Sequence, residues 1–394
     1  MFHNSFIGDA IIEVIQALIE TYSGVIKSVE KEVALPFNCA NQNNTRLEII
    51  QGMVDTNPDA IIVHDEDSNH KQQSACKCNT RFEKIKFLVE TYPDALKSVI
   101  SNGYLLLNCA CEKGASLEVI KFLAETYPDA LRSVNTNGKL PLHCACASHA
   151  SLDVIKFLAE THPDALKICG HNDLLPLHSA CATHASLDVI KFLVEIYPDG
   201  LKSVESNGDL PLHFACACNA SLEVIKTLTE KYPDALKIHG HNTSIPLHCA
   251  CQNNASLEVV KFLVETYPDA LKIFGFGNSL PVHYGCACNA NLEVIKFLAE
   301  TYPDALRSID TNHNLPLHCA CEKGASLDVI KLLVETYPDA LKIHGYDGSL
   351  PLHCACEHGA SLEVMKFLIE TYPKAVNIVN VYSKIPLHYA VSSE

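Results

Sequence analysis

A proline that recurs every 35 residues without interruption is the strongest constraint on how this chain can fold. It occupies Pro141, Pro176, Pro211, Pro246, Pro281, Pro316, Pro351 and Pro386, and the same interval leads back to Leu106, Lys71 and Pro36. A second series has the same period: Pro58, Pro93, Pro128, Pro163, Pro198, Pro233, Pro268, Pro303, Pro338 and Pro373. A fixed period between about 20 and 50 residues is typical of solenoids, propellers and other repeat arrays.

The residues of one period predict two helices and a tip. In residues 138–172, Pro141 suits the first position of a helix, where its missing N–H costs nothing. Ser151 is a good N-cap for a second helix, which carries an apolar stripe with a period of about 3.6 residues. Pro163 ends that helix, and Asp164–Lys167 is predicted to add a short helical turn. The polar residues that follow indicate a turn, and no β-branched alternation supports a propeller blade.

The unit resembles a known repeat. LPLHCACASHA is similar to the T-P-L-H-x-A beginning of the ankyrin repeat, and SLDVIKFLAE is similar to its second helix. The resemblance runs from Ala34 to Val391. It implies an all-α fold, an ankyrin-like α-solenoid of about eleven stacked helix-turn-helix repeats with extended tips. The chain departs from the pattern where Leu140 and Ile245 replace threonine, and in a period of 35 residues where about 33 is typical. The hairpin tips of standard ankyrin repeats are therefore expected to be poorly formed.

The regularity of the period divides the chain into four parts. Residues 1–35 are predicted to form an N-terminal capping helix region, and 36–105 form two degenerate repeats, where Lys71 replaces the proline. Residues 106–385 are eight regular ankyrin-like repeats, and 386–394 are a C-terminal half repeat. An alternative stays open, in which the chain is the recognition module of a larger multidomain enzyme or channel and is a fragment of it.

Composition narrows the classes of partner. Lys and Arg total 30 against 46 Asp and Glu, a formal charge of −16, which argues against nucleic acid or an anionic membrane as the main partner. No secretory signal or membrane-spanning stretch is evident, so no membrane insertion is expected. Nineteen cysteines without a secretory signal indicate a reducing compartment, and the expectation is an intracellular, cytoplasmic, monomeric protein.

Cysteine and histidine form columns through the repeats. Nine cysteines share one position (Cys76, Cys111, Cys146, Cys181, Cys216, Cys251, Cys286, Cys321 and Cys356), and six lie two residues earlier (Cys39, Cys109, Cys144, Cys249, Cys319 and Cys354). Neighbouring repeats lie about 8–10 Å apart, too far for one ion with Zn–S bonds of about 2.3 Å, so these cysteines are expected to be small buried apolar residues. No metal or cofactor is expected.

The recurring histidine is also interpreted as a structural residue of the repeat. It comprises His143, His178, His213, His248, His283, His318, His353 and His388. A residue that nearly every repeat contains serves the repeat, and the ankyrin resemblance implies a hydrogen bond to the adjacent turn backbone. Cys78, Cys218 and Cys288 fall near a helix end and are expected to be more exposed, which leaves thiol-based sensing as a minor hypothesis.

No nucleotide-binding loop, nucleophile elbow or zincin helix is present, and no insertion is large enough for a catalytic domain, so the chain is not expected to be an enzyme. Charged residues of the second helix such as Glu118, Lys121 and Glu125 lie on one helix face and are predicted to form a solvated outer surface.

Specificity is expected where the repeats differ from one another. The end of the first helix and the tip vary most, and in ankyrin-like solenoids these zones line a concave groove. The chain is therefore predicted to be a protein–protein interaction scaffold that binds a protein partner of unknown identity through the groove and the turn tips. The candidate partner-binding residues are His149, His171, Asp173, His184, Asp209, His241, Thr243, Phe276, His313, Tyr346, Asp347 and His358. Phe274 and Phe276 have an alternative role, packing between adjacent tips.

Overall fold

The computed structural model describes residues 82, 86, 89, 90 and 105–391. They divide into two compact units, one ending at His171 and the other beginning at Asn172. The predicted capping region 1–35 and nearly all of the degenerate repeats 36–105 lie outside the described residues, and so does Cys78. The boundaries between predicted parts stay predictions, but each 35-residue period from Leu106 to Val379 contains the same elements in the same order.

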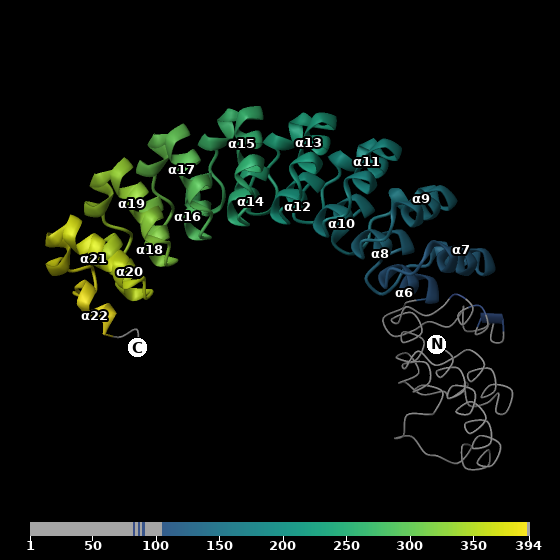
Figure 1. The fold of residues 1–394 in the computed structure, drawn as a ribbon, viewed down its shortest axis with the longest axis horizontal. Helices are drawn as coiled ribbons and strands as arrows, with labels where there is room; N and C mark the ends of the chain where they lie inside the picture. Colours follow the sequence, from purple (N-terminus) through teal and green to yellow (C-terminus); the bar gives the residue numbers. More distant parts are fainter. Residues whose placement is uncertain (1–81, 83–85, 87–88, 91–104, 392–394) are drawn as a thin grey trace, which may run out of the picture. The chain divides into compact units, whose positions relative to one another are not determined.

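Each repeat begins with a short first helix. Pro occupies the first helical position in all of these helices except α6, because its fixed φ suits a helix start and its missing N–H has no intrahelical partner to lose. In Figure 1 the first helices of the second unit, from α12 onward, lie along the inner side of the curve of that unit. The first helices are α6 (Leu106–Glu112), α8 (Pro141–Ala147), α10 (Pro176–Ala182), α12 (Pro211–Ala217), α14 (Pro246–Gln252), α16 (Pro281–Ala287), α18 (Pro316–Glu322), α20 (Pro351–Glu357) and α22 (Pro386–Ala390).

A longer second helix follows and packs on the outer side. Ser is its N-cap in most repeats, and in α11 the Oγ of Ser186 accepts the backbone N–H of Val189 at 3.4 Å. In α17, Asn291 is the cap and accepts the N–H of Glu293. The second helices are α7 (Leu117–Thr126), α9 (Leu152–Thr161), α11 (Leu187–Ile196), α13 (Leu222–Lys231), α15 (Leu257–Thr266), α17 (Leu292–Thr301), α19 (Leu327–Thr336) and α21 (Leu362–Thr371).

The proline after each second helix starts a turn of 3-10 helix, as the sequence predicts. The residue before it, such as Tyr197, leaves helical geometry because the proline ring disfavours it there. These turns are η5 (Pro128–Arg132), η6 (Pro163–Leu166), η8 (Pro198–Lys202), η9 (Pro233–Lys237), η11 (Pro268–Lys272), η13 (Pro303–Arg307), η14 (Pro338–Lys342) and η15 (Pro373–Asn377).

The hydrophobic core extends along the stack of repeats. In unit one α6 packs against α8, and in unit two each first helix from α10 onward packs against the next. Leu142, Ala145 and Cys146 of a first helix are buried with Ile155 and Leu158 of the second. Because each repeat uses its neighbours to bury its apolar face, the core grows with the number of repeats.

The buried histidine column ties each first helix to the segment that leads to the next repeat. In His213, Nδ1 accepts the backbone N–H of Leu210 at 3.0 Å and Nε2 donates to the carbonyl of Ile238 at 3.1 Å. The same pair of bonds is made by His178, His248, His283 and His318. In His353, Nδ1 accepts the N–H of Leu350, and Nε2 bonds the carbonyl of Lys384 instead of the equivalent one. The predicted hydrogen bond to the turn backbone is therefore confirmed, and these histidines hold the stack.

The tips contain turns and no strand in residues 105–391, which confirms that standard hairpin tips are poorly formed. The turn of a tip is formed in one of two ways. In four tips a side chain closes the turn: Oδ1 of Asp310 accepts the N–H groups of Asn312 and Asn314, both at 2.8 Å. Asn135, Glu205 and Asn380 do the same. In the other four, glycine occupies that position, and three of these tips contain η7 (His171–Asp173), η10 (His241–Thr243) or η12 (Phe276–Asn278).

One backbone hydrogen bond joins most neighbouring tips. A backbone N–H of one tip donates to a backbone carbonyl of the preceding tip. Thr311 donates to Gly277 at 2.8 Å, and Tyr346 donates to Asn312 at 2.9 Å. Equivalent bonds start at His171, Ser206 and Val381. The series is interrupted at His241 and Phe276, whose N–H groups make no such bond in the described part of the chain.

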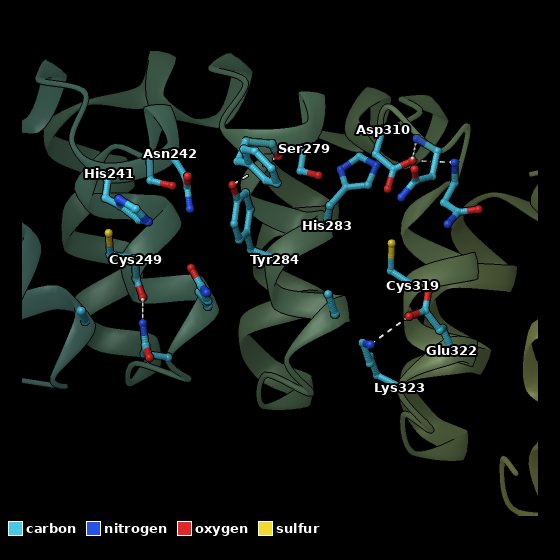
Figure 2. Close-up of a pocket in the computed structure, with 18 of the residues that line it drawn as sticks. His241, Asn242, Cys249, Ser279, His283, Tyr284, Asp310, Cys319, Glu322 and Lys323 are labelled. Atoms are coloured by element: carbon cyan, nitrogen blue, oxygen red, sulfur yellow. Dashed lines mark hydrogen bonds and ion pairs between the residues drawn. The ribbon is translucent and has the colours of Figure 1, made fainter. Parts of the chain in front are cut away.

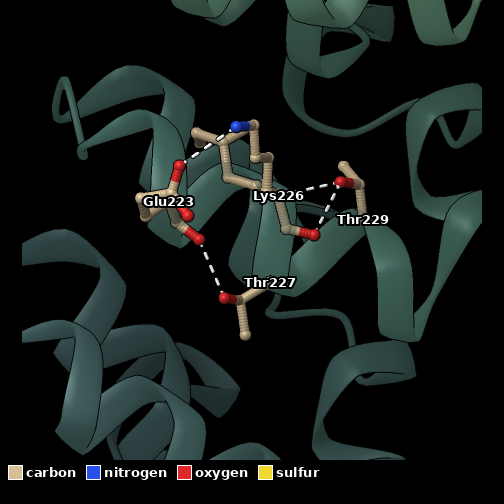
Figure 3. A network of polar contacts seen from close by, with 5 residues as sticks. Glu223, Lys226, Thr227 and Thr229 are labelled. Carbon is tan, nitrogen blue, oxygen red and sulfur yellow. Dashed lines mark hydrogen bonds and ion pairs between the residues drawn. The ribbon is translucent and has the colours of Figure 1, made fainter.

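The outer surface carries exposed charges with local partners. In Figure 3, Lys226 Nζ contacts Glu223 Oε1 at 3.0 Å, and Thr227 donates to the carbonyl of Glu223. Such exposed pairs contribute little to stability. They fit the predicted solvated outer face. Within residues 105–391 none of the helices has the length and apolar character needed to cross a membrane.

Candidate functional site

A groove of about 420 Å³ lies on the inner face of the second unit. Its walls come from the first helices α12, α14, α16 and α18 and from the tips that follow the second helices α11, α13, α15 and α17. Figure 2 shows Tyr284 in the middle, between His241 and Cys249 on one side and Asp310 with Glu322 on the other. Residues of five consecutive repeats therefore line one cavity.

The tip wall of the groove is where the backbone series between tips is interrupted. The N–H of His241 is bonded instead to Oδ1 of Asp209, at 2.8 Å. Gly240 makes this possible, because a Cβ at that position would overlap the same oxygen. At the next tip, the hydroxyl of Tyr284 donates to the carbonyl of Phe276 at 3.4 Å, and the N–H of Phe276 has no partner among the described residues.

One helix position forms the floor of the groove. Cys249, Tyr284 and Cys319 are equivalent residues of α14, α16 and α18, and all three line the cavity. Tyr284 packs edge-on against the buried ring of His248, with ring centroids 5.0 Å apart. Phe214 and Tyr389 replace cysteine at the same position elsewhere and contact His178 and His353 in the same way. Sequence reasoning missed Tyr284, and the signal for it was the change from cysteine to an aromatic residue within one column.

Carboxylates dominate the charge of the groove. Asp209, Asp310 and Glu322 line it, and the one cation among its lining residues is Lys323, which lies 2.8 Å from Glu322 Oε1. That contact raises the pKa of Lys323. Asp209 and Asp310 use Oδ1 for the bonds described above, and neither Oδ2 atom has a partner within the described chain.

The thiols on the groove floor respond to these charges. Burial, with a smaller contribution from the carboxylate of Asp209, raises the pKa of Cys249 to about 12. Burial also raises the pKa of Cys319 to about 12, with Asp310 and Glu322 adding to the effect. Both thiols stay protonated near neutral pH, which makes them poor nucleophiles in this state.

Three of the predicted partner-binding residues meet in the groove: Asp209, His241 and Phe276. Thr243 belongs to the same tip as His241 but does not line the cavity. His149 and His171 belong to the first unit. The remaining six lie elsewhere in the second unit: Asp173, His184, His313, Tyr346, Asp347 and His358.

His149 and His184 have a local structural explanation. Both follow a first helix with φ near +57°, a left-handed conformation that Gly, Asn and, less often, His adopt. Gly114, Asn219, Asn254, Asn289, Gly324 and Gly359 occupy the same position in other repeats and have the same sign of φ. The variation at this position therefore reflects a backbone requirement, and it is a weak guide to binding.

The aromatic tips point to solvent. Phe276 is 66% exposed, Phe274 47% and Tyr346 77%, so packing between tips buries none of them fully. The ring of Tyr346 stacks on His313 with centroids 6.3 Å apart. Phe276 lines the groove and Phe274 does not, although the two belong to the same tip.

Metal and thiol chemistry gain no support in the described residues. Within 105–391 no group of three or more His, Cys, Asp or Glu side chains is placed to hold a metal ion. Cys218 is half-buried and Cys288 exposed, and burial raises the pKa of both thiols, opposite to what a redox-sensing cysteine requires. Cys169 is also exposed, which the column analysis missed because it lies in a tip.

Comparisons with known proteins agree with the architecture. A family model of ankyrin repeats in three copies matches residues 72–169 and 247–344, and a second ankyrin-repeat model matches 347–378. The ankyrin repeat domain of human ASB11 is 22% identical, with a TM-score of 0.47, over 59% of this chain and 98% of that domain. The ankyrin repeat domain of Bcl-3, a member of the IkappaB protein family, is 21% identical, with a TM-score of 0.44, over 56% of this chain and 95% of that domain. No curated protein matches the chain. On the family matches and the repeated helix pairs, the chain belongs to the ankyrin-repeat family.

Proposed function

We propose that this protein is a binding scaffold whose groove between Asp209 and Lys323 holds a segment of a partner protein. Ankyrin repeats are generally protein-interaction modules, and the fold is typically a non-enzymatic scaffold. The observation that carries the proposal is that five consecutive repeats line one cavity, mainly through positions at which the repeats differ. A cavity with a few well-placed polar groups is a natural binding-site hypothesis.

The positions that differ between repeats are not among the constant residues that hold the stack together. The histidine column, the apolar helix faces and the prolines are nearly constant, because every repeat needs them. Groove positions instead alternate in character, as Cys249, Tyr284 and Cys319 do on the floor. Stacking alone does not require a tyrosine there, since cysteine fills the same place in the neighbouring repeats.

Two phenylalanines of one tip provide a matched test. The full chain and its variants Phe276→Ala, Tyr284→Ala and Phe274→Ala are used as baits in lysate of the source cell. Bound proteins are quantified by mass spectrometry. Because Phe276 lines the groove and Phe274 does not, Phe276→Ala and Tyr284→Ala are expected to lose the same specific proteins, which Phe274→Ala retains. Retention of every bound protein by both groove variants, with unchanged circular dichroism, contradicts the proposal.

A further inference from the structure

Resting on that proposed function, we infer that the groove takes an extended protein segment that presents an arginine side chain. The groove combines three carboxylates with exposed aromatic surface from Phe276 and Tyr284. A guanidinium group pairs with carboxylates through its planar set of N–H donors and also stacks on aromatic faces. A lysine ammonium meets the charge requirement alone, so the aromatic residues favour arginine.

The three carboxylates exceed what the fold needs. At the position of Asp310, Asn135 and Asn380 make the same two turn-closing bonds without a charge. At the position of Asp209, the tip that contains Asp310 has the neutral Asn314, and at the position of Glu322, α14 has Gln252. Each of the three positions thus accepts a neutral side chain, and in this groove all three carry a carboxylate.

The field inside the groove is negative. The only cation among the lining residues, Lys323, is paired with Glu322, which leaves the charges of Asp209 and Asp310 without a balancing cation there. Burial is the main cause of the raised pKa values of Cys249 and Cys319 on the floor, and the groove carboxylates add to it because they disfavour the nearby thiolates. A cationic segment is attracted by this field and an acidic one is repelled.

Open hydrogen-bonding groups stand beside the charges. The Oδ2 atoms of Asp209 and Asp310 are available as acceptors, and the N–H of Phe276 is an available donor where the bond between tips is missing. An arginine side chain supplies donors for one of these carboxylates, and the backbone carbonyl of the same segment supplies an acceptor for Phe276. This set of groups fits a peptide segment better than a free cation, which has no acceptor to offer.

The test uses the full 394-residue chain and a displayed library of random peptides. Selected peptides are synthesised twice, with arginine and with citrulline, which keeps the shape of the side chain and removes its charge. Their affinities are measured by fluorescence anisotropy for the natural chain and for the triple variant Asp209→Asn, Asp310→Asn and Glu322→Gln. The neutral equivalents elsewhere in the chain indicate that this variant folds, and its thermal melt checks that. Asp339→Asn is the control, because Asp339 is exposed on η14, outside the groove.

We expect the selected peptides to be enriched in arginine and to lose about tenfold in affinity on replacement by citrulline, since one exposed charge pair is weak and the negative field of the other carboxylates adds to it. The triple variant should lose a similar factor for the arginine peptide and should no longer distinguish citrulline. Peptides that depend on Phe276 and Tyr284 but lack enriched arginine overturn this inference and leave the proposed groove standing. Peptides that bind equally well to Phe276→Ala and Tyr284→Ala overturn the groove itself.

Discussion

His248 donates a hydrogen bond from Nε2 to the backbone carbonyl of Ile273, at 3.1 Å. Its Nδ1 accepts the N–H of Ile245, so both ring nitrogens are used and only the neutral form with the proton on Nε2 satisfies both partners. The first helix of one repeat is thereby fixed to the segment leading to the next. Repetition of this bond makes the neutral state of the histidine column a condition of the stack.

The stability of the array should therefore depend on pH. Burial lowers the pKa of His178, His248 and His318 from 6.5 to about 4 in the folded chain. Between those values the unfolded chain binds protons that the folded chain does not, so the contribution is complete above pH 6.5 and is lost as pH falls toward 4. Each histidine costs about 1.4 kcal/mol per pH unit in that window. Urea unfolding followed by circular dichroism at pH 7.5, 6.5 and 5.5 should show a steep loss below 6.5. Equal midpoints at the three values would sink the prediction.

Replacing one of these histidines should destabilise the repeats around it. His248→Ala leaves the N–H of Ile245 and the carbonyl of Ile273 without this partner, which costs about 2–4 kcal/mol. His358→Ala is the control, because His358 is exposed at the end of α20. Thermal and urea unfolding of the two variants should differ accordingly. Equal stability of His248→Ala and the natural chain would show that the column does not hold the stack.

The cysteines should fall into two classes of reactivity. Cys216, Cys251 and Cys286 are buried, whereas Cys169 and Cys288 are exposed. Alkylation under native conditions, followed by mass spectrometry, should label the exposed pair first and leave the buried residues unmodified until urea unfolds the chain. Early labelling of Cys251 without denaturant would contradict the packing described here.

Gly240 should be intolerant of a side chain because of Asp209. In Gly240→Ala the new Cβ overlaps Asp209 Oδ1 and crowds the ring of His213, and the carboxylate must leave the N–H of His241. The expected cost is about 1–3 kcal/mol. Adding Asp209→Ser should recover most of it, since Ser244, Ser279 and Ser349 occupy the equivalent tip position. Unfolding of the single and double variants by urea measures the recovery, and its absence would mean that another contact causes the loss.

The sequence was sufficient to predict the regular elements. Proline at the first helical position and serine at the second N-cap each impose a local backbone preference, and the period shows where it recurs. The role of the histidine column also followed, because a residue needed in every repeat marks a contact between repeats. These features are local or strictly periodic, so no tertiary information was needed for them.

The groove could be predicted only in part. Asp209, His241 and Phe276 were recognised as variable tip residues, but Tyr284 was overlooked within a column assigned to cysteine. Which variable positions share a cavity depends on the stacking of five repeats, and a single repeat contains no information on that. The variation at His149 was misleading, because it reflects a left-handed backbone position.

The most direct test of the account is site-specific cross-linking in the source cell. The photoreactive amino acid benzoylphenylalanine is introduced in place of Phe276 in the groove, and in a second chain in place of Phe262 on the outer helix α15. The account predicts that the residue at position 276 cross-links to an arginine-containing segment of a partner protein and that the residue at position 262 does not cross-link to that protein. Cross-links to the same partner from position 262 and none from position 276 would contradict it.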